Sequence, residues 1–300
     1  MNASEPSDVA VHERRRLLSL AYRMTGTLAD AEDIVQETYI RWYRLDDRER
    51  NAIRVPAAWL THVASRIALD LIGSAHARRE QSSGQWLPEP VPAGLFAEGT
   101  PADPLEHAVR DDEVNTALLL VLESMTPLER VAFVLHDVFA VPFAEVAEII
   151  GRSAPAARQL ATAARRRVRA GRTRVVEPGE HEDVVRAFQV AAREGDITAL
   201  LRTLAPEVEA RADGGDVVRV APNVVRGSDR VARYLLGVLQ KQPDIRFEEL
   251  RTADGLAYGM LAGDTLVGIT AFHVEDARIT DVWIVMDPRK LTAWMPLEAD

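Results

Sequence analysis

The 300-residue sequence contains no cysteine. Disulfide bonds, zinc sites built on thiolates and redox sensing by a thiol are therefore excluded within it. Long hydrophobic runs are also missing, since no apolar stretch approaches the roughly 20 residues that a membrane-spanning helix needs. The chain starts with polar and charged residues rather than with a secretory signal. We therefore expect a soluble, cytoplasmic protein that makes no membrane contact.

Lysine is nearly absent, because Lys241 and Lys290 are the only two and arginine carries the remaining positive charge. The net charge of −10 is spread unevenly: it is zero for residues 1–80, −3 for residues 81–178 and −7 for residues 179–300. A chain of this length also exceeds one typical domain. The sequence therefore predicts several parts, with the acidic excess in the C-terminal one.

Motifs for catalysis and metal binding are missing as well. The seven histidines show no metal-ligand spacing, and the sequence has no HExxH, no phosphate-binding P-loop, no G-x-S-x-G and no Rossmann glycine pattern. We therefore predict no catalytic residue, no metal and no cofactor.

What the sequence does contain is a pair of predicted amphipathic helices between residues 126 and 174, separated by a tight turn. The first helix is expected to begin at Pro142, which suits a first helical position, and to end at Gly151, and the hydroxyl of Ser153 can cap the second. Small and medium apolar residues on the second helix predict that the two helices cross closely. This helix-turn-helix spacing is the one that places a second helix in the major groove of DNA.

The outer face of that second helix is almost purely basic, and no acidic residue occurs from Arg152 to Arg174. A face of one charge sign repels itself unless an anion such as duplex phosphate binds it. Arginine and glutamine side chains also read base edges. A solvated basic helix on an ordinary bundle is the alternative interpretation. The candidate DNA-binding residues here are Arg158, Gln159, Thr162, Arg165, Arg166 and Arg169.

Residues 1–80 are predicted to form a helical domain. One amphipathic helix stops at Gly26, a second is capped by Thr27, and a third starts at Pro56. The second helix has an outer polar stripe, for which a solvated surface is the simplest explanation. The residues of this stripe are Asp33, Gln36, Glu37 and Arg41.

Three segments, in order, change this interpretation. The sequence from Asp30 to Thr38 is D-A-E-D-I-V-Q-E-T, the helix from Pro56 begins P-A-A-W-L, and Leu122 to Arg130 is L-E-S-M-T-P-L-E-R. Together they resemble the signatures of bacterial sigma factors of the extracytoplasmic-function (ECF) type, with Met125 in place of a leucine. The resemblance implies a subunit of RNA polymerase rather than an enzyme, built on two all-α domains.

The resemblance also implies partners. The polar stripe would contact the β′ clamp helices of core RNA polymerase, and the second sigma domain would contact the β flap. The helix from Pro56 and the loop before it would bind the −10 promoter element, while the basic helix would bind the −35 element. Phosphate contacts at the −10 element are expected from Arg66, Arg78 and Arg79.

The sequence departs from the family at the end of the third helix. Leu71, Gly73 and His76 stand where relatives commonly carry arginine. We therefore expect weaker phosphate anchoring at the −10 element.

Residues 81–108 have the composition of a linker, since proline, glycine and serine there forbid a long helix. Within it, W-L-P-E-P resembles a motif of the sigma-factor subfamily that carries a SnoaL-like C-terminal extension. Because an exposed tryptophan and leucine are unfavourable in water, we expect them to pack on another surface. That surface could be the motif's own domain, the C-terminal domain as a lock, or the polymerase active cleft as a plug. The candidate regulatory residues are Trp86, Leu87, Pro88, Glu89 and Pro90.

After residue 176 the pattern changes to two helices followed by strands, with another helix near residues 228–240. This order predicts an α+β domain in which antiparallel strands wrap on helices. It resembles the SnoaL-like cone of the nuclear-transport-factor-like superfamily, which implies a cavity for a small-molecule ligand. The predicted strands are Val208–Ala212, Val217–Val220, Ile245–Leu250, Leu256–Leu261, Thr265–Val274 and Ile279–Val285.

Two further motifs of that subfamily appear in altered form. A-D-G-G-D-V stands where relatives show D-G-G-G-K, and M-D-P-R-K-L stands where they show N-P-D-K-L. Because the first has lost a glycine and the lysine, a simple hairpin turn is the safer interpretation of its glycines. The candidate regulatory residues are Asp213, Gly214, Gly215, Asp287, Pro288, Lys290 and Leu291.

The leading hypothesis is an ECF sigma factor that its SnoaL-like domain regulates in cis. Its expected parts are a first sigma domain (1–80), a linker (81–108), a second sigma domain (109–176) and the SnoaL-like domain (177–300). One alternative is a ligand-sensing DNA-binding regulator that acts without polymerase. Another is a SnoaL-like enzyme fused to a DNA-binding module, with Asp264, His273 and Asp281 as candidate acid–base groups.

Overall fold

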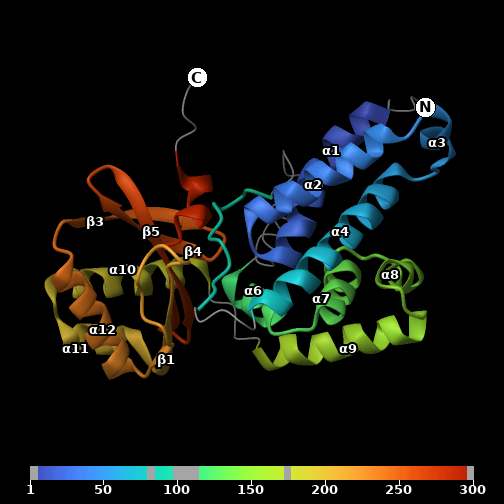
Figure 1. The fold of residues 1–300 in the computed structure, drawn as a ribbon. Coiled ribbons are helices and arrows are strands. Elements are labelled where there is room, and N and C mark those ends of the chain that lie inside the picture. Colours follow the sequence, from blue (N-terminus) through green and yellow to red (C-terminus); the bar gives the residue numbers. More distant parts are fainter. Residues whose placement is uncertain (1–5, 80–84, 97–114, 172–176, 296–300) are drawn as a thin grey trace. The chain divides into compact units, whose positions relative to one another are not determined.

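The computed structural model describes residues 6–79, 85–96, 115–171 and 177–295, which fold into two compact units (Figure 1). The first unit comprises residues 1–82, 96–108 and 118–172, and the second comprises residues 83–95, 109–117 and 173–300. The W-L-P-E-P segment therefore belongs to the same unit as the C-terminal domain. No helix in the described ranges is long and apolar enough to cross a membrane.

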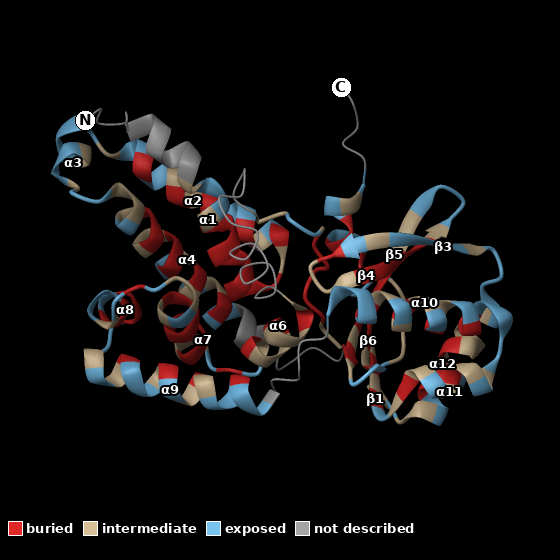
Figure 2. Cartoon of the chain, turned by 180° about the vertical axis from the view of Figure 1, so that it is seen from behind, coloured by how far each residue is buried: buried red, intermediate tan, exposed pale blue. Residues whose placement is uncertain are grey.

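The N-terminal part of the first unit is a helical bundle. It contains α1 (Pro6–Thr25), α2 (Leu28–Arg44), α3 (Asp47–Ala52) and α4 (Pro56–Arg79). The backbone of Gly26 is left-handed (φ 78°) and ends α1, while the Thr27 hydroxyl accepts from the backbone N–H of Asp30 and starts α2. The inner faces of α1, α2 and α4 are buried (Figure 2), with Trp42 only 1% exposed. The predicted order of caps and apolar stripes is confirmed.

The rest of the first unit holds the predicted helix-turn-helix. Its elements are α6 (Thr116–Glu123), whose first two residues belong to the second unit, α7 (Pro127–Phe133), a π-helical turn η2 (Val134–Val138), α8 (Phe143–Ile150) and α9 (Ala154–Gly171). Gly151 (φ 64°) ends α8, and Ser153 Oγ accepts from the N–H of Ala156 at 3.4 Å. Small side chains on the buried face of α9 allow the close crossing of helices. These are Ala157, Ala161 and Ala164, all 0% exposed.

The C-terminal domain combines three longer helices with a sheet. The helices are α10 (Pro178–Glu194), α11 (Ile197–Thr203) and α12 (Ser228–Lys241), and two short turns, η3 (Pro288–Lys290) and η4 (Thr292–Trp294), close the described part. The strands are β1 (Leu204–Asp213), β2 (Val225–Arg226), β3 (Ile245–Thr252), β4 (Gly255–Ala262), β5 (Thr265–Glu275) and β6 (Arg278–Val285). The strand order is β2-β1-β6-β5-β4-β3. The α+β prediction is confirmed.

Two details of that prediction are wrong. The sheet is mixed rather than antiparallel, because the hairpins from β3 to β6 return the chain so that β6 runs beside β1 in the same direction. The expected strand Val217–Val220 is a turn instead, since the N–H groups of Val217 and Val218 both donate to the Gly214 carbonyl. Val217 is 68% exposed, so its β-branched side chain has no sheet face to pack on.

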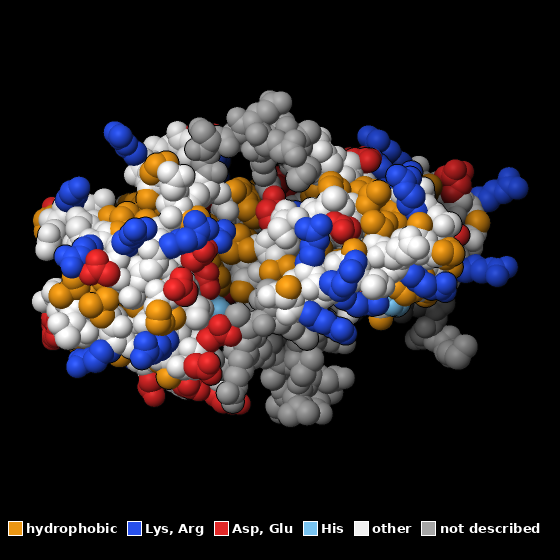
Figure 3. All heavy atoms as spheres, turned by 90° about the horizontal axis from the view of Figure 1, so that it is seen from below, with side chains coloured by type: hydrophobic (Ala, Val, Ile, Leu, Met, Phe, Trp, Pro, Cys, Tyr) orange, Lys and Arg blue, Asp and Glu red, His pale blue; other side chains and the backbone are white. Residues whose placement is uncertain are grey.

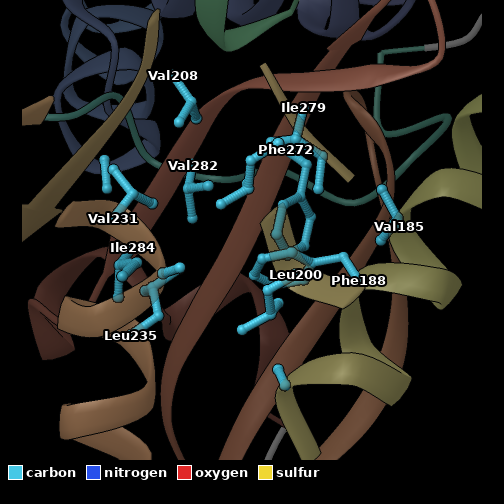
Figure 4. Packing of buried hydrophobic residues seen from close by; sticks show 14 of the residues in the cluster. Val185, Phe188, Leu200, Val208, Val231, Leu235, Phe272, Ile279, Val282 and Ile284 are labelled. Carbon is cyan, nitrogen blue, oxygen red and sulfur yellow. The ribbon is translucent and has the colours of Figure 1, made fainter. Parts of the chain in front are cut away.

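The core of this domain lies between the helices and one face of the sheet (Figure 4). Phe272, Val282 and Ile284 point into it, together with Phe188 of α10 and Leu200 of α11. Side chains alternate between the two faces along a strand. His273 and Asp281 therefore lie on the opposite face, and Asp264 lies in the exposed turn after β4, paired with Arg246. His273 and Asp281 are cross-strand partners on that face, whereas Asp264 lies apart from them, so the three candidate acid–base groups do not converge.

Candidate nucleic-acid interface and linker contact

The basic face predicted from the sequence lies along α9. Figure 3 looks onto the side of the first unit where α9 runs, and blue Arg side chains gather there. Arg165 is half-buried, and the other members of the set are exposed. The exposed members are Arg158, Gln159, Thr162, Arg166 and Arg169. Sequence periodicity alone thus placed these side chains on one accessible surface.

Two of these arginines are held by neighbours and two are not. The Arg158 guanidinium lies 5.6 Å from the centre of the Phe143 ring, and Arg165 Nε donates to Asp137 Oδ1 at 2.5 Å. Arg166 and Arg169 make no hydrogen bond or ion pair with another residue in the described part of the chain. Oriented side chains suit contacts to base edges, whereas unrestrained ones suit contacts to phosphate.

Arg66, expected at the −10 element, has a partner inside the first unit. Its Nη1 donates to the backbone carbonyls of Glu148 (3.3 Å) and Ile149 (3.2 Å), in the last turn of α8. A cation at a helix C-terminus satisfies carbonyls that have no partner within the helix. Arg78 and Arg79 belong to the end of α4, but their side chains lie outside the described part of the structure.

The polar stripe of α2 is exposed at Asp33, Gln36 and Arg41, while Glu37 is half-buried and pairs with Arg41 at 2.8 Å. Beside it lies a groove of about 630 Å³ formed by α1 and α2. Two apolar side chains at this groove, Ile40 (37% exposed) and Tyr43 (55% exposed), were missed by the sequence analysis. Their spacing of three residues on one helix face was the available signal.

The linker contact is built around Leu87, which is 0% exposed. Its N–H donates to Asp213 Oδ2 at 2.9 Å, and its carbonyl accepts from Lys290 Nζ at 2.5 Å. Lys290 Nζ also lies 2.7 Å from Asp213 Oδ2. Asp213 (4% exposed) and Lys290 (5% exposed) are therefore a buried ion pair whose polar atoms are completed by the backbone of the linker.

The rest of the W-L-P-E-P segment is held on the same surface. Lys290 Nζ lies 4.6 Å from the centre of the Trp86 ring, a cation–π distance. The Trp294 indole N–H donates to the Pro90 carbonyl at 2.7 Å. Pro88 and Glu89 are buried as well. Of the three docking surfaces considered for this motif, the C-terminal domain is the one it contacts, and we call these contacts the linker lock.

Backbone hydrogen bonds between residues 91–93 of the linker and residues 251–253 extend the linker lock. The N–H of Ala93 donates to the Arg251 carbonyl at 2.9 Å, and the N–H of Ala253 donates to the Val91 carbonyl at 3.0 Å. The linker thereby pairs with the end of β3, which is an edge strand of the sheet. Pairing of this kind depends on the backbone and left no signal in the side-chain pattern.

Gly214 and Gly215 open the connection from β1 to β2, which pairs antiparallel with β1, and they also allow a close approach of two segments. A Cβ at Gly215 would lie 2.5 Å from Asp287 Oδ2, and one at Gly214 would lie 2.0 Å from the Val218 carbonyl oxygen. The strand that follows, β2, starts only at Val225, so the glycines open a long loop. They allow the Asp213 end of β1 and the Asp287 turn to approach each other.

The second altered motif forms η3. Asp287 accepts from the Arg289 backbone at 3.1 Å and from its guanidinium at 2.7 Å, which holds the pKa of the Asp287 carboxyl below its usual range. The chain therefore turns sharply after Pro288, and Leu291 (2% exposed) anchors the turn. This turn presents Lys290 to Asp213.

Trp294 and the pair Thr116–Asp254 were also missed from the sequence. Asp254 accepts from the Thr116 N–H at 2.6 Å and from its hydroxyl at 2.7 Å, so a residue of the β3–β4 turn caps the start of α6. Burial raises the pKa of the Asp254 carboxyl. A cap supplied from 138 residues away leaves no local sequence signature.

Comparisons with known proteins agree with this arrangement. The model of Sigma-70 region 2 matches residues 10–80, and that of Sigma-70 region 4 matches residues 115–168. The chain is 42% identical over 291 residues to the ECF RNA polymerase sigma factor SigJ of Mycobacterium tuberculosis, covering 93% of this chain and 91% of that protein. It is 35% identical to the probable ECF RNA polymerase sigma factor SigI of the same species, covering 100% of this chain and 99% of that protein.

One solved structure gives a parallel result. The crystal structure of Mycobacterium tuberculosis SigJ matches with a TM-score of 0.75 and 39% identity, covering 98% of this chain and 100% of that one. A SnoaL-like protein of unknown function from Burkholderia thailandensis matches with a TM-score of 0.30 and 23% identity, covering 37% of this chain and 97% of that one.

Proposed function

Because the chain belongs to the ECF RNA polymerase sigma factors, we propose that it directs core polymerase to a set of promoters and that the linker lock regulates this step. The observation that carries the regulatory part is the burial of Leu87 between Asp213 and Lys290. Side chains of the C-terminal domain thus bind both the backbone N–H and the carbonyl of Leu87, within the segment that joins the two sigma regions.

We assign the parts of this function to the expected segments. Residues 1–80 and 109–176 act as the two sigma domains, residues 81–108 link them, and residues 177–300 form the SnoaL-like regulatory domain. The α2 stripe, with Ile40 and Tyr43 beside it, contacts core polymerase, since an exposed apolar pair rimmed by polar groups suits a protein interface. The α9 arginines contact the −35 element.

Arg66, Arg78 and Arg79 remain our candidates at the −10 element. The Arg66 guanidinium donates to two α8 carbonyls and must break these hydrogen bonds before it binds phosphate. DNA binding at Arg66 therefore competes with a contact inside the first unit.

A catalytic C-terminal domain is not part of the proposal. His273 and Asp281 lie on the sheet face opposite the helix-covered core, and Asp264 is engaged by Arg246 on the surface. The three acid–base candidates therefore share no cavity in the described residues. The named relatives are sigma factors, which act in transcription.

Assembly with core polymerase tests the function directly. We expect the full chain to co-purify with core RNA polymerase and to support run-off transcription from promoters selected from genomic DNA. Replacing Gln36 with Glu and Arg41 with Glu should weaken co-purification, because both side chains are exposed on α2. Arg193→Glu, an exposed arginine of α10, is the matched control. Operator binding without any polymerase association would instead support a regulator that acts alone.

A further inference from the structure

The turn between β3 and β4 contacts the chain at two points that are far apart in the sequence. The first point is the linker, where backbone hydrogen bonds join residues 91–93 to residues 251–253. The second point is Thr116, the first residue of α6, which the side chain of Asp254 binds. Neighbouring residues of one turn thus hold both points, and we call these two contacts together the turn clasp.

The contact between Asp254 and Thr116 uses both oxygens of the carboxylate. Oδ1 accepts from the Thr116 N–H at 2.6 Å, and Oδ2 accepts from the Thr116 hydroxyl at 2.7 Å. The first N–H groups of a helix have no acceptor within that helix, so the carboxylate satisfies a backbone donor of α6 that the helix leaves unpaired. Thr116 is only 6% exposed. The start of α6 is therefore attached to the C-terminal domain by two charge-assisted hydrogen bonds.

The turn clasp shortens the chain that is available between the two sigma regions. Region 2 ends at residue 80 and region 4 starts at residue 115. At about 3.4 Å per extended residue, this stretch spans at most about 120 Å. The turn clasp holds residues 93 and 116 within about 20 Å of each other, since they bind positions only three residues apart, and about 45 Å of chain precedes residue 93. The maximal reach falls to about 65 Å.

Promoter geometry makes this difference relevant. The proposed function places region 2 on the −10 element and region 4 on the −35 element, whose names set them about 25 base pairs apart, or about 85 Å of duplex. A reach of about 120 Å exceeds this separation, whereas a reach of about 65 Å needs the length of the regions themselves in addition. The 24-residue helix α4 alone is about 36 Å long. The turn clasp, rather than the length of the linker, therefore limits the separation that the chain can cover.

We propose that Asp254 is a positioning residue that selects promoters by the length of the spacer between the two elements. A spacer of optimal length is bound with the turn clasp closed. A longer spacer is bound only after the hydrogen bonds between Asp254 and Thr116 break, so it is used less. This selection rests on the proposed function, because it requires both regions to bind DNA, whereas the turn clasp itself does not.

Run-off transcription by core RNA polymerase with the full chain measures this selection on promoters whose spacer is lengthened one base pair at a time. The readout is the ratio of transcript from a lengthened spacer to transcript from the best one. Asp254→Ala removes both hydrogen bonds and should raise this ratio at least about tenfold, the factor that one hydrogen bond to a charged group supplies. Thr116→Val keeps the backbone N–H and should raise the ratio by about threefold.

Asp196→Ala is the matched control. Asp196 caps α11 by accepting from the Ala199 N–H at 2.9 Å, a contact between residues only three positions apart, so its loss frees no length of chain. A general loss of stability lowers transcript from every promoter and leaves the ratio unchanged. An increased ratio in Asp254→Ala with an unchanged ratio in Asp196→Ala would therefore assign spacer selection to the turn clasp.

Amide hydrogen exchange at Thr116, followed by NMR, reports the turn clasp without transcription. The Thr116 N–H should be protected in the wild-type chain and exchange at least about tenfold faster in Asp254→Ala. An unprotected Thr116 N–H in the wild-type chain would overturn the inference, as would a spacer ratio that Asp254→Ala leaves unchanged while it exposes this amide. Absence of transcript from every promoter would instead reject the proposed function, and spacer selection with it, but not the turn clasp seen by exchange.

Discussion

The arginines of α9 and the lysine of η3 are cations used in opposite ways. Arg166 and Arg169 are exposed and make no ion pair with a described residue, whereas Lys290 is 5% exposed and bound to Asp213, Leu87 and Trp86. Exposed charges add little to folding stability, but a buried charge that loses its partner is strongly destabilising. The first set is therefore available to an external anion, while Lys290 is committed to the protein's own structure.

The largest expected effect comes from breaking the buried pair. Lys290→Ala should lower the free energy of unfolding by about 3–5 kcal/mol, because Asp213 remains buried without its cation. Urea unfolding of the full chain measures this value. Lys241→Ala, which removes the other lysine at an exposed position, should change it by less than about 0.5 kcal/mol. Equal changes in the free energy of unfolding for the two substitutions would show that Lys290 does not stabilise the linker lock.

The double variant Asp213→Leu with Lys290→Met sharpens the same comparison. Replacing both charges with apolar groups of similar size removes the unpaired charge that a single substitution leaves behind. We expect the double variant to recover only part of the stability lost by Lys290→Ala, because the buried N–H and carbonyl of Leu87 lose their partners. Additive losses would instead mean that the two side chains contribute independently.

The oriented arginines of α9 should show the next largest effect, this time in binding. Arg158→Ala and Arg165→Ala should each weaken binding of the polymerase complex to its promoter by about 1–3 kcal/mol if they contact bases, and should relax selectivity at one position. Arg193→Ala, exposed on α10, is the control. Promoter selectivity that both α9 variants leave unchanged would remove them from the base-contacting set.

The unrestrained arginines should act through phosphate instead. Arg166→Ala and Arg169→Ala should weaken binding nearly uniformly across promoter sequences, and each should reduce the slope of log K against log salt by about 1. Titrations of labelled promoter DNA at several salt concentrations measure this slope. A change in sequence preference without a change in slope would reverse the roles assigned to the two pairs.

The smallest expected effect concerns pH. Arg289 holds the pKa of Asp287 below its usual range, so this carboxylate stabilises the fold above the unfolded value of about 3.9 and loses that contribution as pH falls through the folded value. Arg289→Ala should therefore lower the stability slightly from pH 6 to pH 8 and flatten its further loss below about pH 4, because the contribution that acid removes is already absent. Thermal unfolding across this range detects the difference.

The sequence predicted those features whose signals are local. Periodic apolar residues and caps located α2, α8 and α9, and the alternation of side chains located five of the six expected strands. The resemblance of ordered motifs singled out Asp213, Lys290 and the residues from Trp86 to Pro90. Leu87 and Lys290, which contact each other, are 203 residues apart, and no local sequence pattern predicted this contact.

The errors have the same origin. The parallel pairing of β1 with β6 follows from the number of intervening strands, and the turn at Val217 follows from carbonyl contacts at Gly214. Trp294 and the Thr116–Asp254 cap depend on groups brought together only by the fold. Contacts between residues that are far apart in the sequence could be identified only from the structure.

Run-off transcription with core RNA polymerase tests the central claim, that the linker lock governs activity. Trp86→Ala removes the ring that faces Lys290 but keeps the Asp213–Lys290 pair, and it frees part of the chain between the two matched sigma regions. We predict severalfold more transcript from Trp86→Ala than from the wild-type chain, and no change from Lys241→Ala. Equal transcript from all three, with Trp86→Ala shown to release the linker by its faster proteolysis, would contradict the account.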